Sequence, residues 1–174
     1  MSHFVQKFGG TSLGTAERMK GVAQIIVDHL KQHHRVTAVV SAMSSYNKIE
    51  GTTSRLLEAG SLALRGGPFY QMIDLVEESH NEALSKAIHN PEIQKQLREF
   101  VHRELRSLKS FLKAIHVIRE ISPRSQDLIV GVGATLPCIL GVRPARRGAH
   151  EIPGVVPIGS LGDCPWDPTG GGHG

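Results

Sequence analysis

The sequence predicts an α/β protein, and its first 43 residues show why. Residues 3–8, HFVQKF, are typical of a short strand, and the turn sequence GGTSLG follows. A helix is expected from Thr15, and its apolar positions share one face: Met19, Val22, Ala23, Ile26, Val27 and Leu30. The valine-rich run at 36–43, VTAVVSAM, is typical of a parallel strand covered on both faces. Strand, helix and strand in this order predict a βαβ unit.

The middle of the chain is predicted to be helical. A polar loop at 44–53 precedes a helix over 54–67 that ends at a Gly-Gly pair. The helical pattern at 68–120 breaks at HNP, so we expect an antiparallel pair of helices. The second helix of the pair carries an apolar stripe, which is more typical of a domain core than of an oligomer interface: Val101, Leu105, Leu108, Leu112 and Ile115. Another helix is expected after the N-cap Ser122 and Pro123.

Composition limits the classes of function. A chain of 174 residues suits one domain or part of one. Its net charge of +4 is spread along the chain, so we expect no nucleic-acid partner. Cys138 and Cys164 are the two cysteines, which argues against a disulfide scaffold or a zinc site and favours a reducing, cytoplasmic setting. No apolar run is long enough to span a bilayer and the chain does not begin like a signal peptide, so we expect no membrane partner.

The composition changes after residue 133. Residues 141–174 contain nine glycines and five prolines, and no helical or alternating apolar pattern continues there. We therefore expect the segment 134–174 to be a divergent tail that is disordered or loosely packed.

Lys7 lies at the end of the first predicted strand, and one residue, Phe8, separates it from a glycine pair. Backbone N–H groups around Gly9 and Gly10 can approach an anion closely, and the start of the following helix adds positive potential. Lys7 adds a point charge, and Thr11 and Ser12 offer hydroxyl donors. The order of these residues differs from a P-loop and from the dinucleotide fingerprint. The pattern favours a phosphate site over an ordinary tight turn with a solvated lysine, which is the alternative for a bare K-x-G-G.

Three motifs resemble the aspartokinases of the amino acid kinase family. VQKFGGTSLG at 5–14 is similar to the family's opening K-F-G-G-T-S signature. VVSAMSSYNKIEGTTSRLL at 39–57 resembles the next segment of the family, and its sequence is closest to the fungal forms. ISPRSQDLIVGVG at 121–133 is similar to the family's Ser-Pro-Arg-Thr helix. The resemblance identifies residues 1–133 as the N-terminal part of an amino acid kinase domain.

The resemblance implies a three-layer α/β/α sandwich, truncated here and with a helical hairpin inserted. It implies that the γ-phosphoryl group of ATP is transferred to L-aspartate, the first step towards threonine and methionine, with ATP and Mg²⁺ as cofactors. It leaves a homo-oligomer open and assigns no metal-ligating residue in this segment. Lys7 would be catalytic. The residues expected to bind the ATP phosphates are Lys7, Gly9, Gly10, Thr11 and Ser12, and those expected to bind aspartate are Ser41 and Thr53.

The residues taken alone leave other roles open. Ser41 fits a turn serine equally well, and Thr53 is more typical of a helix N-cap. Lys48 and Glu50 are more typical of a charged surface loop than of a substrate contact.

The sequence departs from the family at 131–138, GVGATLPC. Ala134 stands where the family has the glutamate that would meet the ammonium group of aspartate. Pro137 should end the helix early, because proline inside a helix costs about 3 kcal/mol or more. Further on, we recognise neither the family's second catalytic lysine and aspartate nor its nucleotide-binding segment. We therefore expect little or no turnover.

Three functions follow from these observations. The first is an aspartate kinase. The second is a catalytically inactive remnant that binds phosphate or a full-length subunit. The third is another amino acid kinase, such as a glutamate or nucleoside-monophosphate kinase, which would not predict the sequence EGTTSRLL.

Overall fold

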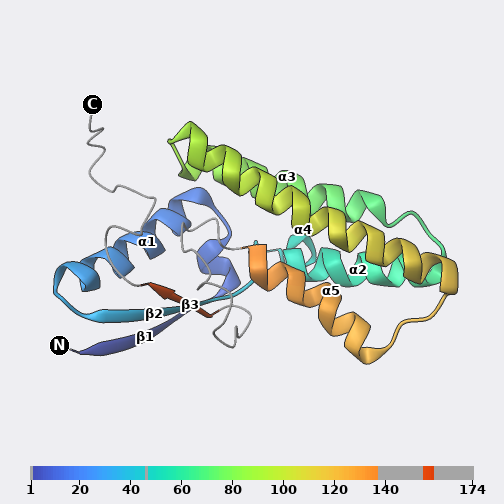
Figure 1. Ribbon diagram of the computed structural model, residues 1–174, viewed down its shortest axis with the longest axis horizontal. Coiled ribbons are helices and arrows are strands. Elements are labelled where there is room, and N and C mark those ends of the chain that lie inside the picture. Colours follow the sequence, from blue (N-terminus) through green and yellow to red (C-terminus); the bar gives the residue numbers. More distant parts are fainter. Residues whose placement is uncertain (1, 46, 137–154, 159–174) are drawn as a thin grey trace.

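The structure is a computed structural model that describes residues 2–45, 47–136 and 155–158. A small sheet and one helix lie at one end of the molecule, and a group of helices lies at the other (Figure 1). In chain order the elements are β1 (His3–Phe8), the short 3₁₀ helix η1 (Gly10–Leu13), α1 (Ala16–Lys31), β2 (Arg35–Val40), the short 3₁₀ helix η2 (Lys48–Glu50), α2 (Thr52–Arg65), α3 (Tyr70–Ala87), α4 (Pro91–Ile118), α5 (Pro123–Thr135) and β3 (Val155–Ile158).

The first two strands and α1 form the predicted βαβ unit, in which β1 and β2 pair in parallel. α1 begins as predicted, because the Thr15 hydroxyl accepts a hydrogen bond from the N–H of Arg18 at 3.3 Å. β2 ends at Val40, before its predicted end at Met43. The chain leaves the sheet there because residues 41–44 turn towards the loop that follows β1.

α1 covers one face of the sheet, and no element of the described residues covers the other. The first face contributes to the hydrophobic core through Val36, Ala38 and Val40. On the same face Phe4 packs against His29 of α1, with ring centroids 4.8 Å apart. Val5, which points the opposite way, is 68% exposed. The α/β class is confirmed, but the expected third layer is absent from the described residues, since a second layer of helices needs a further crossover connection.

Residues 155–158 form β3, which pairs antiparallel with β2 and gives the strand order β1-β2-β3. This strand lies within the segment 134–174, for which composition predicted no regular structure. A short apolar run can pair with an open strand edge whatever the composition around it, and the tail as a separate divergent segment stays a prediction. Residues 137–154 and 159–174 of the segment lie outside the described residues.

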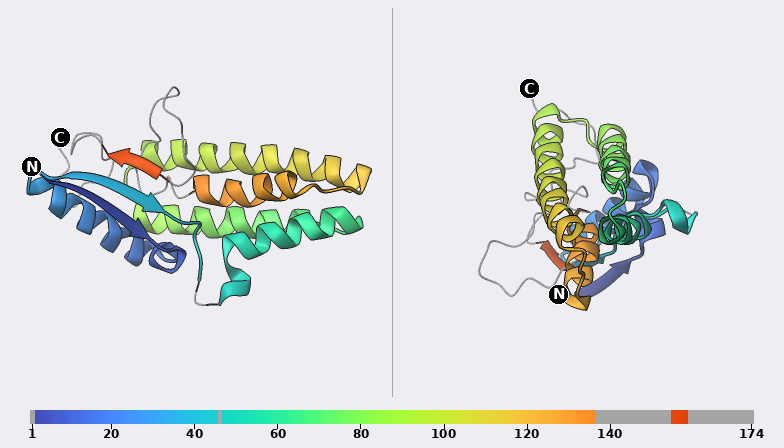
Figure 2. Two further views of the ribbon diagram at one scale, coloured as in Figure 1. Left: turned by 90° about the horizontal axis from the view of Figure 1, so that it is seen from below. Right: turned by 90° about the vertical axis from the view of Figure 1, so that its right-hand side faces the viewer.

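Helices α2 to α5 pack together beyond the end of the sheet (Figures 1 and 2). α3 and α4 form the predicted antiparallel pair, separated where the Asn90 side chain accepts hydrogen bonds from the N–H groups of Glu92 and Ile93. Three side-chain contacts join the two helices in opposite chain directions: Asp74 to Lys109 at 2.7 Å, Glu77 to His102 at 2.8 Å and Ser85 to Arg98 at 2.6 Å.

α5 begins and ends as predicted. The Ser122 hydroxyl accepts a hydrogen bond from the N–H of Ser125 at 3.1 Å, and Pro123 occupies the first turn. The helix ends at Thr135, ahead of Pro137, which lies outside the described residues. None of the helices in the described ranges is long and apolar enough to cross a membrane.

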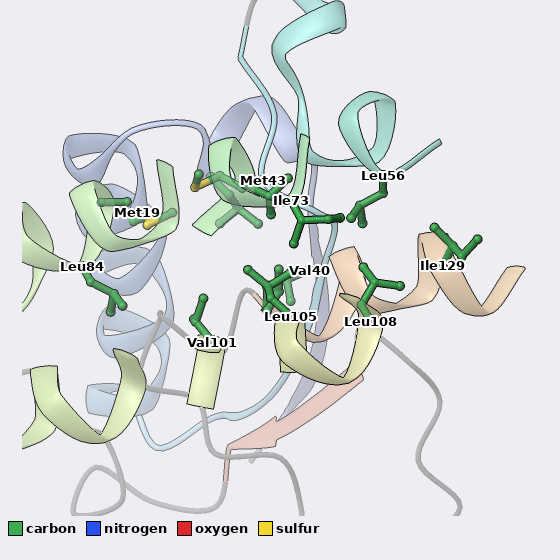
Figure 3. Packing of buried hydrophobic residues seen from close by; sticks show 14 of the residues in the cluster. Met19, Val40, Met43, Leu56, Ile73, Leu84, Val101, Leu105, Leu108 and Ile129 are labelled. Carbon is green, nitrogen blue, oxygen red and sulfur yellow. The ribbon is translucent and has the colours of Figure 1, made fainter. Parts of the chain in front are cut away.

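The predicted apolar stripe of α4 lies in the core. All five of its residues are buried: Val101, Leu105, Leu108, Leu112 and Ile115. Figure 3 shows Leu105 and Leu108 among side chains from the other helices and from the end of β2, including Leu56, Ile73 and Ile129. One hydrophobic cluster therefore joins the sheet to the helices and fixes the end of β2 against α2 and α5.

His80 of α3 is a polar group enclosed in this core, with no exposed surface. Its Nδ1 lies 2.7 Å from the carbonyl oxygen of Val76, which can only accept, so Nδ1 carries the proton. Its Nε2 is buried and has no partner among the described residues. Burial lowers the pKa of His80 to about 4; the nearby Arg55 charge also lowers it, and the bond to Val76 opposes both.

The buried imidazole predicts an acid-sensitive fold. The pKa of His80 is lower in the folded state than its ordinary value of 6.5, so its neutral form is favoured by folding. The contribution of neutral His80 to the free energy of unfolding should be fully present above pH 6.5. The free energy of unfolding should fall by about 3 kcal/mol as the pH drops to about 4. Urea unfolding at about pH 7.5 and about pH 4.5 measures this loss. His80→Leu should reduce the difference in the free energy of unfolding between the two pH values. An unchanged difference in that variant would contradict the assignment of the acid sensitivity to His80.

Candidate functional site

Two turns at the carboxyl ends of β1 and β2 form the candidate site. The N–H of Ser41 donates to the carbonyl of Phe8 at 3.2 Å, and the N–H of Ser44 donates to the carbonyl of Gly10 at 3.1 Å. Parallel strands place these turns at the same edge of the sheet, which is where α/β proteins bind ligands. The structure thus brings Lys7, Gly10 and Ser41, three of the predicted site residues, to one edge.

The two turns approach too closely for side chains at two of the glycines. A Cβ atom on Gly10 would lie 2.4 Å from the carbonyl oxygen of Ala42 and 2.9 Å from the Cβ of Ser44. A Cβ atom on Gly14 would lie 2.0 Å from the carbonyl oxygen of Ser44. These contacts are with backbone or with a Cβ, which cannot move aside. Gly10 and Gly14 are therefore required by close backbone approach.

Lys7 and unpaired backbone donors make this turn electropositive. The Lys7 side chain is exposed, and its Nζ lies 3.7 Å from the position of a Cβ atom on Gly9. No carboxylate of the described residues forms an ion pair with Lys7. The N–H groups of Gly10 and Thr11, at the start of η1, have no acceptor among the described residues. An ammonium group next to unpaired N–H groups is suited to an anion.

Thr11 and Ser12 lie on the side of the turn that faces α1. Both are exposed, and both line an open hollow of about 400 Å³ with Phe8, Arg18, Gly21, Val22 and Ile25. Arg18 Nη1 donates to the carbonyl of Thr11 at 3.0 Å and so supports the turn from this side. The motif did not predict this role for Arg18. The available signal was a basic residue in the first turn of a helix, where an acidic one is favoured.

The start of α2 is joined to the turn after β2. The N–H of Thr52 donates to the carbonyl of Met43 at 3.0 Å. Ser41 is half-buried at the strand end, whereas Thr53 is exposed in the first turn of α2. Gly51 is the N-cap, so the alternative that Thr53 caps the helix is wrong. Sequence reasoning singled out Thr53 and not its neighbour Thr52, which is only 3% exposed.

The loop that carries Lys48 and Glu50 is tied to α2. Both side chains are exposed. The Asn47 side-chain amide donates to the Glu50 carboxylate at 2.8 Å, and the Ser54 hydroxyl donates to the carbonyl of Lys48 at 2.6 Å. These contacts fit an ordered surface loop, which is the reading that the residues alone favoured.

The end of α5 packs directly on the turn after β2. A Cβ atom on Gly133 would lie 3.1 Å from Leu56 Cδ1, 3.2 Å from Thr52 Cγ2 and 3.4 Å from Ala42 Cβ. Ala134 is the next residue and is half-buried. Its methyl group supplies no carboxylate for a substrate ammonium group.

The described residues do not provide a protein-based Mg²⁺ site. They contain no group of three or more His, Cys, Asp or Glu side chains placed to hold a metal ion. The turn around Lys7 offers an ammonium group, amides and hydroxyls, whereas Mg²⁺ prefers carboxylate and phosphate oxygens.

The chain belongs to the amino acid kinase family, whose model matches residues 3–135 and so includes the strand, the glycine turn with its lysine and the crossover helix. The relatives are aspartokinases. The chain is 38% identical to aspartokinase from Saccharomyces cerevisiae over 142 residues, covering 78% of this chain and 26% of that protein. It is 40% identical to aspartokinase from Schizosaccharomyces pombe over 139 residues, covering 77% and 26%. The resemblance to aspartokinases, the fungal forms included, is confirmed, and the chain spans about a quarter of these relatives' length.

Solved aspartokinases share the fold. Escherichia coli aspartokinase III in complex with aspartate and ADP matches with a TM-score of 0.60 and 23% identity, covering 79% of this chain and 27% of that chain. Clostridium acetobutylicum aspartate kinase matches with a TM-score of 0.58 and 20% identity, covering 78% and 27%. The described residues therefore adopt part of the amino acid kinase fold.

The packing around Gly133 predicts opposite effects for two glycine substitutions. Gly133→Ala should destabilise the protein by about 1 kcal/mol, because three neighbours crowd the added methyl group. Gly21→Ala is the matched control within α1, where nothing lies within 4 Å of the added atom. It should stabilise the protein by about 0.5–1 kcal/mol through helix propensity. Urea unfolding measures both, and a stabilising Gly133→Ala would show that α5 does not pack closely on the turn.

Proposed function

We propose that this chain carries the phosphate-binding and acceptor-binding part of an aspartate kinase site. The reaction is transfer of the γ-phosphoryl group of ATP to the side-chain carboxylate of L-aspartate, which gives 4-phospho-L-aspartate. The observation that carries the proposal is the close contact of the two turns. It places Lys7, the N–H groups of Gly10 and Thr11, and Ser41 at one edge of the sheet. Kinship with aspartokinases supports aspartate as the acceptor.

The chemistry needs charge and alignment more than a base. A free aspartate carboxylate has a pKa of about 3.9, so the nucleophile is already ionised at neutral pH. The site must bring two anions together in line. Lys7 and the unpaired N–H groups can neutralise the phosphate, while the hydroxyls of Ser41 and Thr53 can orient the amino acid. ATP would bring its Mg²⁺ on its own phosphates, since the described residues offer no metal-binding cluster.

A second candidate function is binding without turnover. Ala134 favours it, because the position next to Gly133 has no carboxylate to meet the ammonium group of aspartate. The family match also ends at residue 135. In this case the chain binds phosphate or a full-length aspartokinase subunit. A cytoplasmic location, which the sequence favours, stays a prediction for either function, and a homo-oligomer stays open.

Lys7 is expected to be the main cation of the phosphate site. Lys7→Ala should weaken binding of ATP or pyrophosphate at least about tenfold. The reason is that the Lys7 ammonium group is the only full charge that the described residues of β1 and η1 offer next to the glycine turn. Lys31→Ala is the matched control, since Lys31 is exposed at the far end of α1. Isothermal titration calorimetry measures both. Equal affinities in the two variants would remove the proposed role of Lys7.

Turnover is expected to be little or none in this chain alone. Loss of one well-placed stabilising group commonly costs about 10²- to 10³-fold in rate, and here the carboxylate at position 134 is replaced by a methyl group. A chimaera that joins residues 1–133 to the C-terminal portion of a full-length aspartokinase should release ADP in an aspartate-dependent assay. Ala134→Glu in the 174-residue chain should tighten aspartate binding at least about tenfold. Equal activity of the chain and the chimaera, abolished in each by Lys7→Ala, would show that this segment suffices for catalysis.

A further inference from the structure

The outer side of β1 carries backbone groups that no described residue binds. The strand order is β1-β2-β3, and Figure 2 shows β1 at the margin of the sheet. The carbonyl of Phe8 faces β2, where it accepts from the N–H of Ser41. Because backbone groups alternate in direction along a strand, the N–H and C=O groups of His3, Val5 and Lys7 point away from β2.

The sequence of β1 does not protect this edge. Proteins usually protect an edge strand with proline, a bulge, several charges or a covering segment. β1 contains no proline, and its six residues pair one to one with β2 without a bulge. Lys7 is the only Lys, Arg, Asp or Glu in the strand. The edge is therefore open to pairing with another strand.

An apolar hollow lies beside this edge, on the face that α1 covers. The apolar part of its wall is formed by Phe8, Gly21, Val22 and Ile25. Ile25 is 47% exposed. Nothing lies within 4 Å of a Cβ atom on Gly21, so the backbone of α1 is accessible there. A second helix can approach closely at Gly21 and place an apolar side chain in the hollow.

Gln6, in the middle of the strand, has a side-chain acceptor without a donor. Gln6 is half-buried, and its Oε1 is buried with no partner among the described residues. α1 meets one end of β1 at residues 21–22 and the other end at His29. Ile25 is therefore level with Gln6, so one partner can contact both.

We propose that a second copy of this chain pairs with β1 in the antiparallel direction, across a two-fold axis at Gln6. The two Gln6 amide groups then lie next to each other, and each can donate to the Oε1 of the other. The two α1 helices lie side by side on one face of the joined sheet. Ile25 of each copy enters the hollow of the other. Both copies use the same surface, so the assembly closes as a dimer.

The sequence of β1 is self-complementary in this register. Phe4 lies opposite Phe8 of the second copy, which places two aromatic rings on the α1 face. Val5 lies opposite Lys7 of the second copy, so the two lysines do not face each other. Aromatic pairs favour strand pairing, whereas like charges directly opposite each other oppose it. These pairings favour a second copy over a strand of unrelated sequence.

Sedimentation velocity of the 174-residue chain over about a hundredfold range of concentration tests the dimer. The dimer fraction should rise with concentration. Ile25→Glu places a charge in the hollow and should raise the dissociation constant at least about tenfold. Val117→Glu is the matched control on α4, because Val117 is 72% exposed there, and it should stay within about threefold of the parent chain. Unchanged spectra of core amides in each variant confirm that it is folded.

Amide hydrogen exchange by NMR tests the edge itself. In the proposed register the N–H groups of Val5 and Lys7 donate to the second copy. Their exchange should slow at least about tenfold between the low and the high concentration, and Ile25→Glu should abolish this protection. The N–H of Thr53, which has no acceptor among the described residues, is the control and should exchange equally fast at both concentrations.

Three outcomes would overturn the proposal. The first is a chain that stays monomeric with unprotected Val5 and Lys7 amides. The second is a dimer that neither protects these amides nor responds to Ile25→Glu, because its interface lies elsewhere. The third is a monomer whose Val5 and Lys7 amides become protected only when the separate C-terminal portion of a full-length aspartokinase is added, because the edge then takes a different partner. None of these outcomes affects the pyrophosphate test of Lys7.

Discussion

The close contact between the turn after β1 and the turn after β2 determines the rest of the site. Gly10 and Gly14 leave no room for a Cβ atom against the backbone of Ala42 and Ser44. This contact fixes the turn that presents Lys7 relative to the turn that presents Ser41. The same short segment positions the start of α2 through Met43, and α5 packs on it through its own glycine. Glycines therefore fix how the two turns lie against each other, and this arrangement positions Lys7 and Ser41.

Helices α2 to α5 pack against the end of β2 and so support this edge of the sheet. The cluster shown in Figure 3 joins the end of β2 to α2, α3, α4 and α5, so the turns rest on a close-packed core. The α3–α4 pair extends away from the site and is held by polar contacts along its length. His80 of α3 has no exposed surface, and its pKa is lowered. We therefore expect acid to destabilise the folded helices through His80, which is separate from the chemistry at Lys7.

Much of the fold and part of the site could be predicted from the sequence. Local patterns were sufficient for the βαβ unit, for the helix start at Thr15, for the break at HNP, for the N-cap Ser122 and for the buried stripe of α4, because each depends on residues near in the chain. The burial of Thr52 in preference to Thr53 could not be predicted, since it is decided by how α5 packs on α2. The same limit applies to β3 and to the open face of the sheet, which depend on pairing between distant segments.

The most direct test of the account compares Gly9→Ala with Gly10→Ala in pyrophosphate binding by calorimetry. Gly9 has φ of −75° and ψ of 163°, which any residue adopts, and its added methyl group would meet only Lys7 Nζ at an ordinary 3.7 Å. Gly10→Ala would force the two turns apart, because the added atom would lie 2.4 Å from a carbonyl oxygen. The account predicts that Gly9→Ala binds pyrophosphate within about threefold of the parent chain and that Gly10→Ala loses at least about tenfold in affinity. Equal binding by the two variants would contradict the claim that close contact of these turns creates the anion site.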